Sequence, residues 1–343
     1  MEPEDGNRDA IGFVLYDRKA LFLCGFAAVR AFAADALPAL DAEKAVTVSG
    51  VSSGAYMAVQ LHVAHSASVK GVGAIAGGPY YCAQGSFWTA YFNCMDPGFF
   101  VPLPTAAFLK AQTEALAKAG RIDPSANLAS SRAWLFTGAR DKTVSRDVVE
   151  GLYGFYSIYK VDTVIVRDRT AGHAMVTENA GNPDCGASAP PYINDCDYDA
   201  ARQLLEHLLG KLSAPAAKES GRLMRFEQNP FGSSAISMDE EAYVYIPKAC
   251  ESERCRVHVA FHGCRQGISF VGEQFVRDAG YNRWADANRL IVLYPQAIAR
   301  WWPYNPRGCW DWWGYTGAQY HTKEGAQIGA VKAMLDRLSA PRR

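Results

Sequence analysis

The sequence has no excess of charge of either sign, because 35 lysine and arginine residues balance 35 aspartate and glutamate residues. A chain without net charge has no general electrostatic attraction for nucleic acid or for an anionic membrane surface, so we expect no nucleic-acid partner. Internal repeats and low-complexity tracts are also missing. Hydrophobic residues make up 49% of the chain, which is enough for a large buried core.

Long apolar runs are missing too, and we expect no membrane span. The run Ala20–Val29 follows a basic pair and precedes Ala31-Phe32-Ala33, a small-x-small pattern. This arrangement is typical of a secretory signal peptide cleaved after Ala33. A buried first helix is the alternative, since Arg30 interrupts the apolar character. We therefore expect residues 1–33 to be a signal peptide and the protein to be secreted, to the periplasm or the medium.

The nine cysteines agree with export. Removal of the signal peptide removes Cys24 and leaves an even number, which suits disulfide bonds in an oxidising compartment. No CxxC pair is present, so we expect no metal site. Proximity in the sequence predicts three pairs and elimination leaves the fourth: Cys82–Cys94, Cys185–Cys196, Cys250–Cys255 and Cys264–Cys309.

Strand-like and helix-like segments alternate from residue 44 onward. This alternation predicts an α/β fold with a mostly parallel sheet and helices on both faces, in a single domain over residues 34–343. Residues 176–200 are expected to form an ordered excursion, and Lys218–Met238 a polar connection. The expected strands are 46–48, 72–75, 134–137, 163–166, 242–246, 256–261 and 290–294, and the expected helices include 55–64, 201–212 and one from near Thr322.

A G-x-S-x-G pattern, Gly50-Val51-Ser52-Ser53-Gly54, lies between a predicted strand and a predicted helix. That context is the one required by the nucleophile elbow of α/β hydrolases, in which the serine occupies a strained turn. The pattern predicts Ser52 as a catalytic nucleophile. A plain Gly/Ser turn is the alternative.

A serine nucleophile needs a base, and the base needs an orienting carboxylate, in the chain order Ser, acid, His for this class. Asp141 follows the third predicted strand and is the expected acid, with Asp147 as a possible substitute. His173 follows the fourth predicted strand, next to Gly172, and is the expected base. The histidines on predicted helices or inside a strand are weaker candidates.

An oxyanion hole needs two backbone N–H groups. One is expected from Ser53, the residue after the nucleophile. The second normally comes from a loop after an earlier strand, but no such loop precedes Ser52. Residues 257–264, which end in His262-Gly263-Cys264, have the right pattern late in the chain. The simplest explanation is a circularly permuted α/β-hydrolase fold.

Taken in order, the motifs SGVSSGAYMA, GARDKTV, AGHAM, FHGC, LYPQA and NPRGCWDWWGY resemble the extracellular poly(3-hydroxybutyrate) depolymerases of the circularly permuted catalytic type. The resemblance covers roughly residues 40–338. It implies Ser52, Asp141 and His173 as a catalytic triad, with the N–H groups of Ser53 and Cys264 as the oxyanion hole. It also implies a polyester or oligomeric ester substrate, no cofactor, and a single catalytic domain that we expect to be a monomer.

Seven large aromatic residues fall between Trp301 and Tyr315, in a segment rich in glycine, proline and asparagine. A loop cannot easily bury so many rings, so we expect Trp310, Trp312 and Trp313 to bind substrate and to supply a polymer-adhesive patch. Packing at the domain edge is the alternative. Aromatic platforms also suit sugars, so a feruloyl or acetylxylan esterase remains a second candidate, and a non-catalytic binding protein on the same fold a third.

Overall fold

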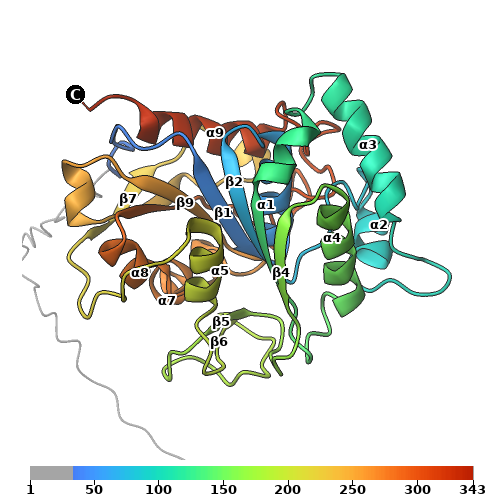
Figure 1. The fold of residues 1–343 in the computed structure, drawn as a ribbon, viewed down its shortest axis with the longest axis horizontal. Coiled ribbons are helices and arrows are strands. Elements are labelled where there is room, and N and C mark those ends of the chain that lie inside the picture. Colours follow the sequence, from blue (N-terminus) through green and yellow to red (C-terminus); the bar gives the residue numbers. More distant parts are fainter. Residues whose placement is uncertain (1–33, 343) are drawn as a thin grey trace, which may run out of the picture. The chain divides into compact units, whose positions relative to one another are not determined.

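The computed structural model describes residues 34–342, which are built around a central eight-stranded sheet (Figure 1). The expected signal peptide lies outside the described residues. All neighbouring strands pair in parallel except β8, which is antiparallel to both of its neighbours. In sheet order the strands are β4 (Asp162–Val166), β3 (Arg132–Phe136), β2 (Val69–Ile75), β1 (Val46–Val51), β9 (Arg256–Phe261), β10 (Leu290–Tyr294), β8 (Glu241–Ile246) and β7 (Arg222–Glu227).

The first strand of the chain lies at the centre of the sheet. From β1 the chain builds outward through β2, β3 and β4 to one edge, and the later strands build the other half. The strand β9 therefore pairs with β1, with Gly50 opposite Phe261, although the two are far apart in sequence. We call residues 262–264 the oxyanion loop, after the role expected for them. The strand order is the one expected when the strand before this loop has been moved behind the nucleophile strand by circular permutation.

Helices cover both faces of the sheet. On one face lie α1 (Ser53–Ala64), α4 (Arg146–Ile158) and α9 (Ala326–Ser339); α1 contacts α9 and is joined to α4 by a hydrogen bond between His62 and Tyr156. On the other face α5 (Ala200–Leu209) packs against β2 and β3 and contacts α8 (Tyr281–Ala287) (Figure 1). The predicted two-faced α/β fold is confirmed.

Smaller elements lie outside this frame. The expected excursion at 176–200 holds a two-stranded parallel sheet, β5 (Met175–Thr177) with β6 (Ile193–Asp195). The remaining elements are α2 (Phe87–Asn93), α3 (Ala106–Lys118), α6 (Ile268–Val271), α7 (Gln274–Asp278) and the short 3₁₀ turns η1 (Ser125–Ser130), η2 (Ser234–Ile236) and η3 (Lys248–Glu251).

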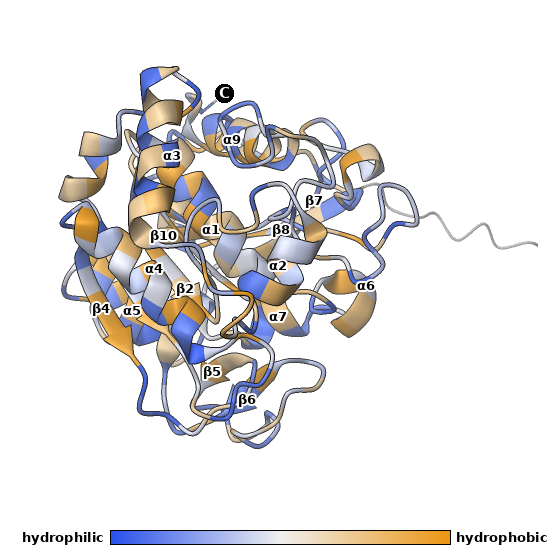
Figure 2. Ribbon diagram, turned by 90° about the vertical axis from the view of Figure 1, so that its right-hand side faces the viewer, coloured by the Kyte–Doolittle hydropathy of each residue, from blue (hydrophilic) through white to orange (hydrophobic). Residues whose placement is uncertain are grey.

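Burial follows from position in the sheet. Every residue of β1 is buried, as a parallel strand covered on both faces requires, and α1 is buried along its whole length. The edge strand β4 carries the hydrophobic residues Val164, Ile165 and Val166, which colour it orange in Figure 2. None of the helices in residues 34–342 has the length and apolarity needed to cross a membrane.

Two expectations about the chain's layout were wrong. Lys218–Met238 is not only a connection, because it contains the edge strand β7, whose residues alternate between exposed and buried. Its exposed arginine and glutamate residues make the segment look polar, which is common at a sheet edge. The last helix begins at Ala326 rather than near Thr322, since the residues between them form turns.

Candidate active site

Ser52 stands at the sharp turn between β1 and α1. Its backbone φ is 56° and its ψ is −122°, a conformation that non-glycine residues rarely adopt. A Cβ on Gly50 would lie 2.3 Å from the Gly54 carbonyl carbon, and a Cβ on Gly54 would lie 2.4 Å from the His262 carbonyl oxygen. Both glycines are therefore required by close backbone approach, as the nucleophile elbow demands. The Ser52 hydroxyl does not cap the helix that follows it.

The expected acid and base meet in the structure. His173 Nδ1 lies 2.8 Å from Asp141 Oδ2. The other carboxylate oxygen, Oδ1, accepts hydrogen bonds from the N–H groups of Thr143 at 2.8 Å and Val144 at 3.0 Å. These contacts fix Asp141, whose side chain is 1% exposed, and they orient the imidazole with Nε2 away from the carboxylate.

The alternative acid, Asp147, is exposed in the first turn of α4, where its N–H donates to the Ser145 hydroxyl. The structure thus brings Asp141, and not Asp147, to His173. Ser52, Asp141 and His173 follow β1, β3 and β4, and the carboxyl ends of parallel strands share one edge of a sheet.

Two backbone N–H groups lie free beside the nucleophile. Within residues 34–342, the N–H groups of Ser53 and Cys264 donate to no other group. Ser53 opens α1, so its N–H belongs to the uncapped first turn of a helix. A Cβ on Gly263 would lie 3.4 Å from the Ser52 Cβ, which places the loop before Cys264 against the elbow. Two free donors at this position are what an oxyanion hole requires, so this pair is the candidate oxyanion hole.

The other buried histidines are held as neutral rings. His258 contacts Thr47 Oγ1 through Nδ1 and Ser49 Oγ through Nε2, and burial lowers its pKa to about 3. Burial also lowers the pKa of His262 to about 4. Among residues 34–342, no group of three or more His, Cys, Asp or Glu side chains is arranged to hold a metal ion.

All four predicted disulfide pairs are confirmed. The pair Cys264–Cys309 has a Cα–Cα distance of 4.2 Å and joins the candidate oxyanion loop to the Trp-rich segment. It is reinforced by the N–H of Arg265, which donates to the Arg307 carbonyl at 2.7 Å. The oxyanion loop is therefore anchored to the segment that the sequence linked to substrate.

A cavity of about 210 Å³ opens beside Ser52 and is lined mainly by apolar and aromatic side chains. Such a lining with few polar groups is typical of a ligand site. Its walls come from α1, α2 and the segment 304–313. The lining residues are Ser52, Tyr56, Phe87, Ala90, Tyr91, Met95, Val144, Cys264, Tyr304, Asn305, Pro306, Arg307, Cys309, Trp312 and Trp313.

Of the three tryptophans predicted to bind substrate, two line the cavity and one is buried in the core. Trp312 stacks on Tyr56, with ring centroids 4.0 Å apart, and lines the cavity together with Trp313. The expectation for Trp310 was wrong: it is 0% exposed and packs against Phe261 beneath the oxyanion loop, with centroids 5.0 Å apart. A large ring next to the end of a central strand packs in the core and does not line the cavity.

Sequence reasoning missed the contribution of α2. Its residues Phe87 and Tyr91, one turn apart, line the cavity. The signal was present as four aromatic residues within the six-residue stretch 87–92, which is too many for the buried side of so short a helix.

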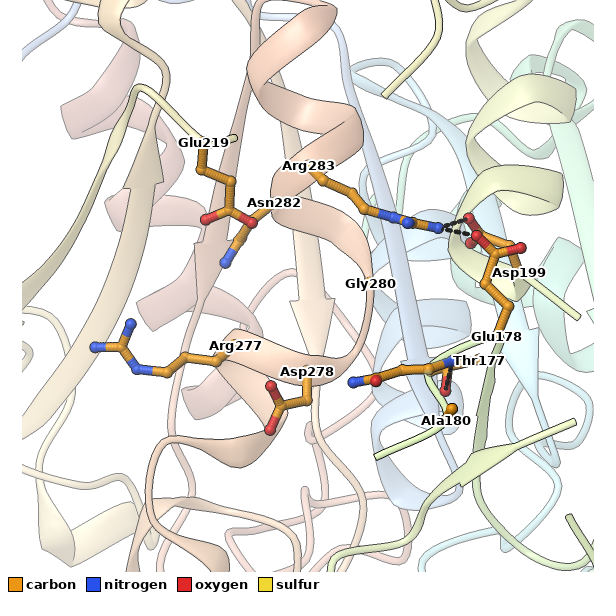
Figure 3. A pocket seen from close by; sticks show the side chains of 11 residues that line it. Thr177, Glu178, Ala180, Asp199, Glu219, Arg277, Asp278, Gly280, Asn282 and Arg283 are labelled. Atoms are coloured by element: carbon orange, nitrogen blue, oxygen red, sulfur yellow. Dashed lines mark hydrogen bonds and ion pairs between the residues drawn. The ribbon is translucent and has the colours of Figure 1, made fainter. Parts of the chain in front are cut away.

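A second cavity, of about 260 Å³, is polar and contains none of the predicted site residues. Figure 3 shows Arg283 pointing at Glu178 and Asp199, and Arg283 Nη2 lies 2.7 Å from Asp199 Oδ2. Burial raises the pKa of the nearby Glu219 carboxyl. Arg283, Glu178 and Asp199 satisfy one another, so the apolar cavity beside Ser52 is the better candidate for chemistry.

Comparison with known proteins identifies the family. The family profile described as "Esterase PHB depolymerase" matches residues 241–341. A polyhydroxybutyrate depolymerase of Talaromyces funiculosus is 36% identical over 326 residues, which cover 89% of this chain and 93% of the relative. The chain belongs to the polyhydroxybutyrate depolymerase family. A poly(3-hydroxybutyrate) depolymerase of Delftia acidovorans is 43% identical over 330 residues, but the chain spans only 65% of that relative's length.

Solved structures of this depolymerase family share the fold. The crystal structure of the enzyme from Penicillium funiculosum superposes with a TM-score of 0.81 at 35% identity, covering 89% of this chain and 98% of that one. A PHB depolymerase complexed with an R3HB trimer superposes equally well, at 34% identity with the same coverage. The α/β-hydrolase fold and the family resemblance expected from the motifs are confirmed.

Proposed function

We propose that this protein is a secreted serine esterase that hydrolyses poly(3-hydroxybutyrate) or its oligomers through an acyl-enzyme on Ser52. The observation that carries the proposal is the 2.8 Å hydrogen bond between His173 and Asp141, at the sheet edge where Ser52 occupies its strained turn. Membership of the depolymerase family supports the choice of substrate.

The proposed reaction runs in two steps. Ser52 Oγ attacks the ester carbonyl while His173 Nε2 takes the hydroxyl proton, and Asp141 stabilises the imidazolium that forms. The carbonyl oxygen becomes negative and accepts hydrogen bonds from the N–H groups of Ser53 and Cys264. The C–O bond of the ester breaks, the alcohol leaves with the proton from His173, and a water molecule then releases the acid by the same route in reverse.

The cavity supports a neutral ester as substrate. Among the described residues that line it, Arg307 is the only charged one, whereas rings and methyl-bearing side chains make up most of the wall. A hydroxybutyryl unit is uncharged and carries an apolar methyl group, so it gains by leaving water for such a wall. We propose that Trp312 and Trp313 contact the bound acyl chain.

An enzyme that acts on a solid polymer also needs a surface that adheres to the polymer. We define an aromatic rim as the exposed rings Trp88, Phe99, Phe100, Trp301 and Trp302, which are 66–92% exposed. Trp88 shares α2 with the cavity residues, and Trp301 contacts the cavity residue Tyr304 with ring centroids 5.7 Å apart. Exposed aromatic rings of this kind are typical of a surface that contacts an apolar partner. We propose that the rim adheres to the polyester.

The proposal also covers where the enzyme acts and in what state. Four disulfides suit an oxidising compartment, and together with the signal-like N-terminus they support export to the periplasm or medium. We propose that the enzyme acts as a monomer, without cofactor or metal, and has no nucleic-acid partner.

The test is turnover on 3-hydroxybutyrate oligomers, amorphous polymer, and acetylated and feruloylated xylan measured side by side, with Ser52→Ala as the blank. We expect Ser52-dependent release of hydroxybutyrate and little release from xylan. Faster turnover of xylan esters would show that the protein is a carbohydrate esterase. Substrate binding with no turnover by the unsubstituted protein would make it a binding protein.

A further inference from the structure

Gln266 is a fully buried side chain that joins two loops of the candidate active site. Its Oε1 accepts a hydrogen bond from the Gly263 N–H at 2.7 Å. Its Nε2 donates to the carbonyl oxygens of Tyr192 at 2.8 Å and Pro191 at 3.2 Å. One amide therefore bridges the oxyanion loop and the segment around residue 190.

On the oxyanion side, Gly263 is held at both of its polar groups. Gln266 binds the N–H, and the Nδ1–H of the neutral His262 donates to the Gly263 carbonyl at 2.7 Å. His262 Nε2 in turn accepts from the Ala297 N–H at 3.0 Å, which fixes its tautomer. In a trans peptide the C=O and the next N–H point in opposite directions. The Gln266 side chain on the Gly263 N–H and His262 on its carbonyl therefore together fix the direction of the Cys264 N–H.

On the base side, the same Tyr192 carbonyl also accepts from the Met175 N–H at 2.8 Å, two residues beyond His173. The His173 N–H donates to Ser188 Oγ at 2.9 Å. A Cβ on Gly172 would lie 2.2 Å from the Ala187 carbonyl oxygen, so the His173 loop packs directly on this segment. The segment 185–192 thus holds the His173 loop in place through hydrogen bonds and direct packing.

We propose that Gln266 is a positioning residue that fixes the Cys264 N–H relative to His173. The inference rests on the proposed function, since it assumes that these groups act on one ester. Both must be placed correctly about the same carbonyl, and an error of about 1 Å in such a placement can cost about a hundredfold in rate. Gln266 acts through other residues and touches no reacting atom.

The experiment compares Gln266→Met, which keeps the volume but removes the three hydrogen bonds of the side chain, with Asn282→Leu. Asn282 is also a buried amide, bonded to the Val276 carbonyl and the Tyr294 hydroxyl, away from the site. The readouts are kcat and KM on p-nitrophenyl butyrate, per active site titrated with a phosphonate, and inhibition by butylboronic acid, whose tetrahedral Ser52 adduct is an anion that places a boron-bound oxygen where the oxyanion would form. We expect kcat of Gln266→Met to fall about ten- to hundredfold with KM within about twofold, and inhibition to weaken in parallel.

The control Asn282→Leu should lose thermal stability but keep kcat per titrated site within about twofold. If Gln266→Met does not fold, Gln266→Asn serves instead, because it keeps a buried amide that is one methylene too short to reach both loops. Unchanged kcat per site in the folded variant, or a loss matched by Asn282→Leu, would overturn the proposal. Absence of Ser52-dependent hydrolysis in the unsubstituted protein would instead refute the proposed function.

Discussion

Asp141 and His173 are 32 positions apart in the chain, yet the carboxylate of one lies 2.8 Å from the imidazole Nδ1 of the other. The second carboxylate oxygen accepts hydrogen bonds from two backbone N–H groups, so the position of the acid does not depend on the histidine alone. The contact occupies Nδ1 of His173 and leaves Nε2 as the ring nitrogen that can act as a base, which the proposed mechanism requires.

Replacing this carboxylate should therefore disable the base. In Asp141→Asn the amide can present its NH₂ to Nδ1 and favour the wrong tautomer, so kcat should fall on the order of 10⁴, as for the equivalent loss in serine proteases. Hydrolysis of p-nitrophenyl butyrate measures the effect. Asp147→Asn is the matched control and should stay near normal, because that carboxylate is exposed in the first turn of α4. Near-normal activity of Asp141→Asn with an inactive Asp147→Asn would reverse the assignment.

The aromatic rim should matter for polymer and not for small esters. Trp301→Ala and Trp302→Ala remove rings that are each 83% exposed, so we expect slower hydrolysis of amorphous polymer with little change on a soluble ester. Trp310→Ala should behave differently, with both activities falling together and a stability loss of about 3–5 kcal/mol, because Trp310 is a core ring. Equal losses on both substrates for the Trp301 and Trp302 variants would contradict the proposal that the rim adheres to the polymer.

Stability should fall in mild acid because of the buried histidines. Burial lowers the pKa of His62 and His258 to about 3 and that of His262 to about 4, below the ordinary value near 6.5. A lowered folded pKa means that the unfolded chain binds the proton first, so this stability is present above pH 6.5 and is lost toward pH 3. Each histidine contributes a slope of up to about 1.4 kcal/mol per pH unit. Thermal unfolding between pH 4 and 8 measures the trend, which His258→Gln should flatten; a constant Tm from pH 7 to 5 would contradict it.

The Cys264–Cys309 disulfide should be needed for rate as well as stability. Replacing both cysteines by serine opens a loop of 45 residues, and chain entropy predicts a loss of about 4 kcal/mol. We also expect lower kcat, because the oxyanion loop loses its anchor to the Trp-rich segment. The control is the Cys250–Cys255 double variant, which opens only 5 residues and should cost about 2 kcal/mol without changing kcat. Equal kcat in the two folded variants would show that the bond is purely structural.

Much of this site could be predicted because its signals are local. The elbow needs glycines at fixed spacing around Ser52, and the acid and base each follow a strand whose apolar run is visible in the sequence. The bounds of β9 and β10 were predicted correctly for the same reason, since buried parallel strands are short apolar runs.

The missed features depend on tertiary contacts. The strand β7 is recognisable only through its pairing with β8, because its exposed face is charged. Trp310 and Trp312 are two positions apart in a loop, and only the packed core decides that one ring is buried under Phe261 while the other faces the cavity. Gln266 looks like an ordinary polar residue until its three partners are brought together.

The central claim is that Ser52 carries the acyl group of a hydroxybutyrate ester. Its most direct test is to titrate the protein with a serine-directed phosphonate, follow hydrolysis of the 3-hydroxybutyrate trimer, and map the label by mass spectrometry. We predict that one equivalent of label per chain, attached to Ser52, abolishes trimer hydrolysis. Label on Ser53 or elsewhere, or full trimer hydrolysis by protein labelled at Ser52, would contradict the account.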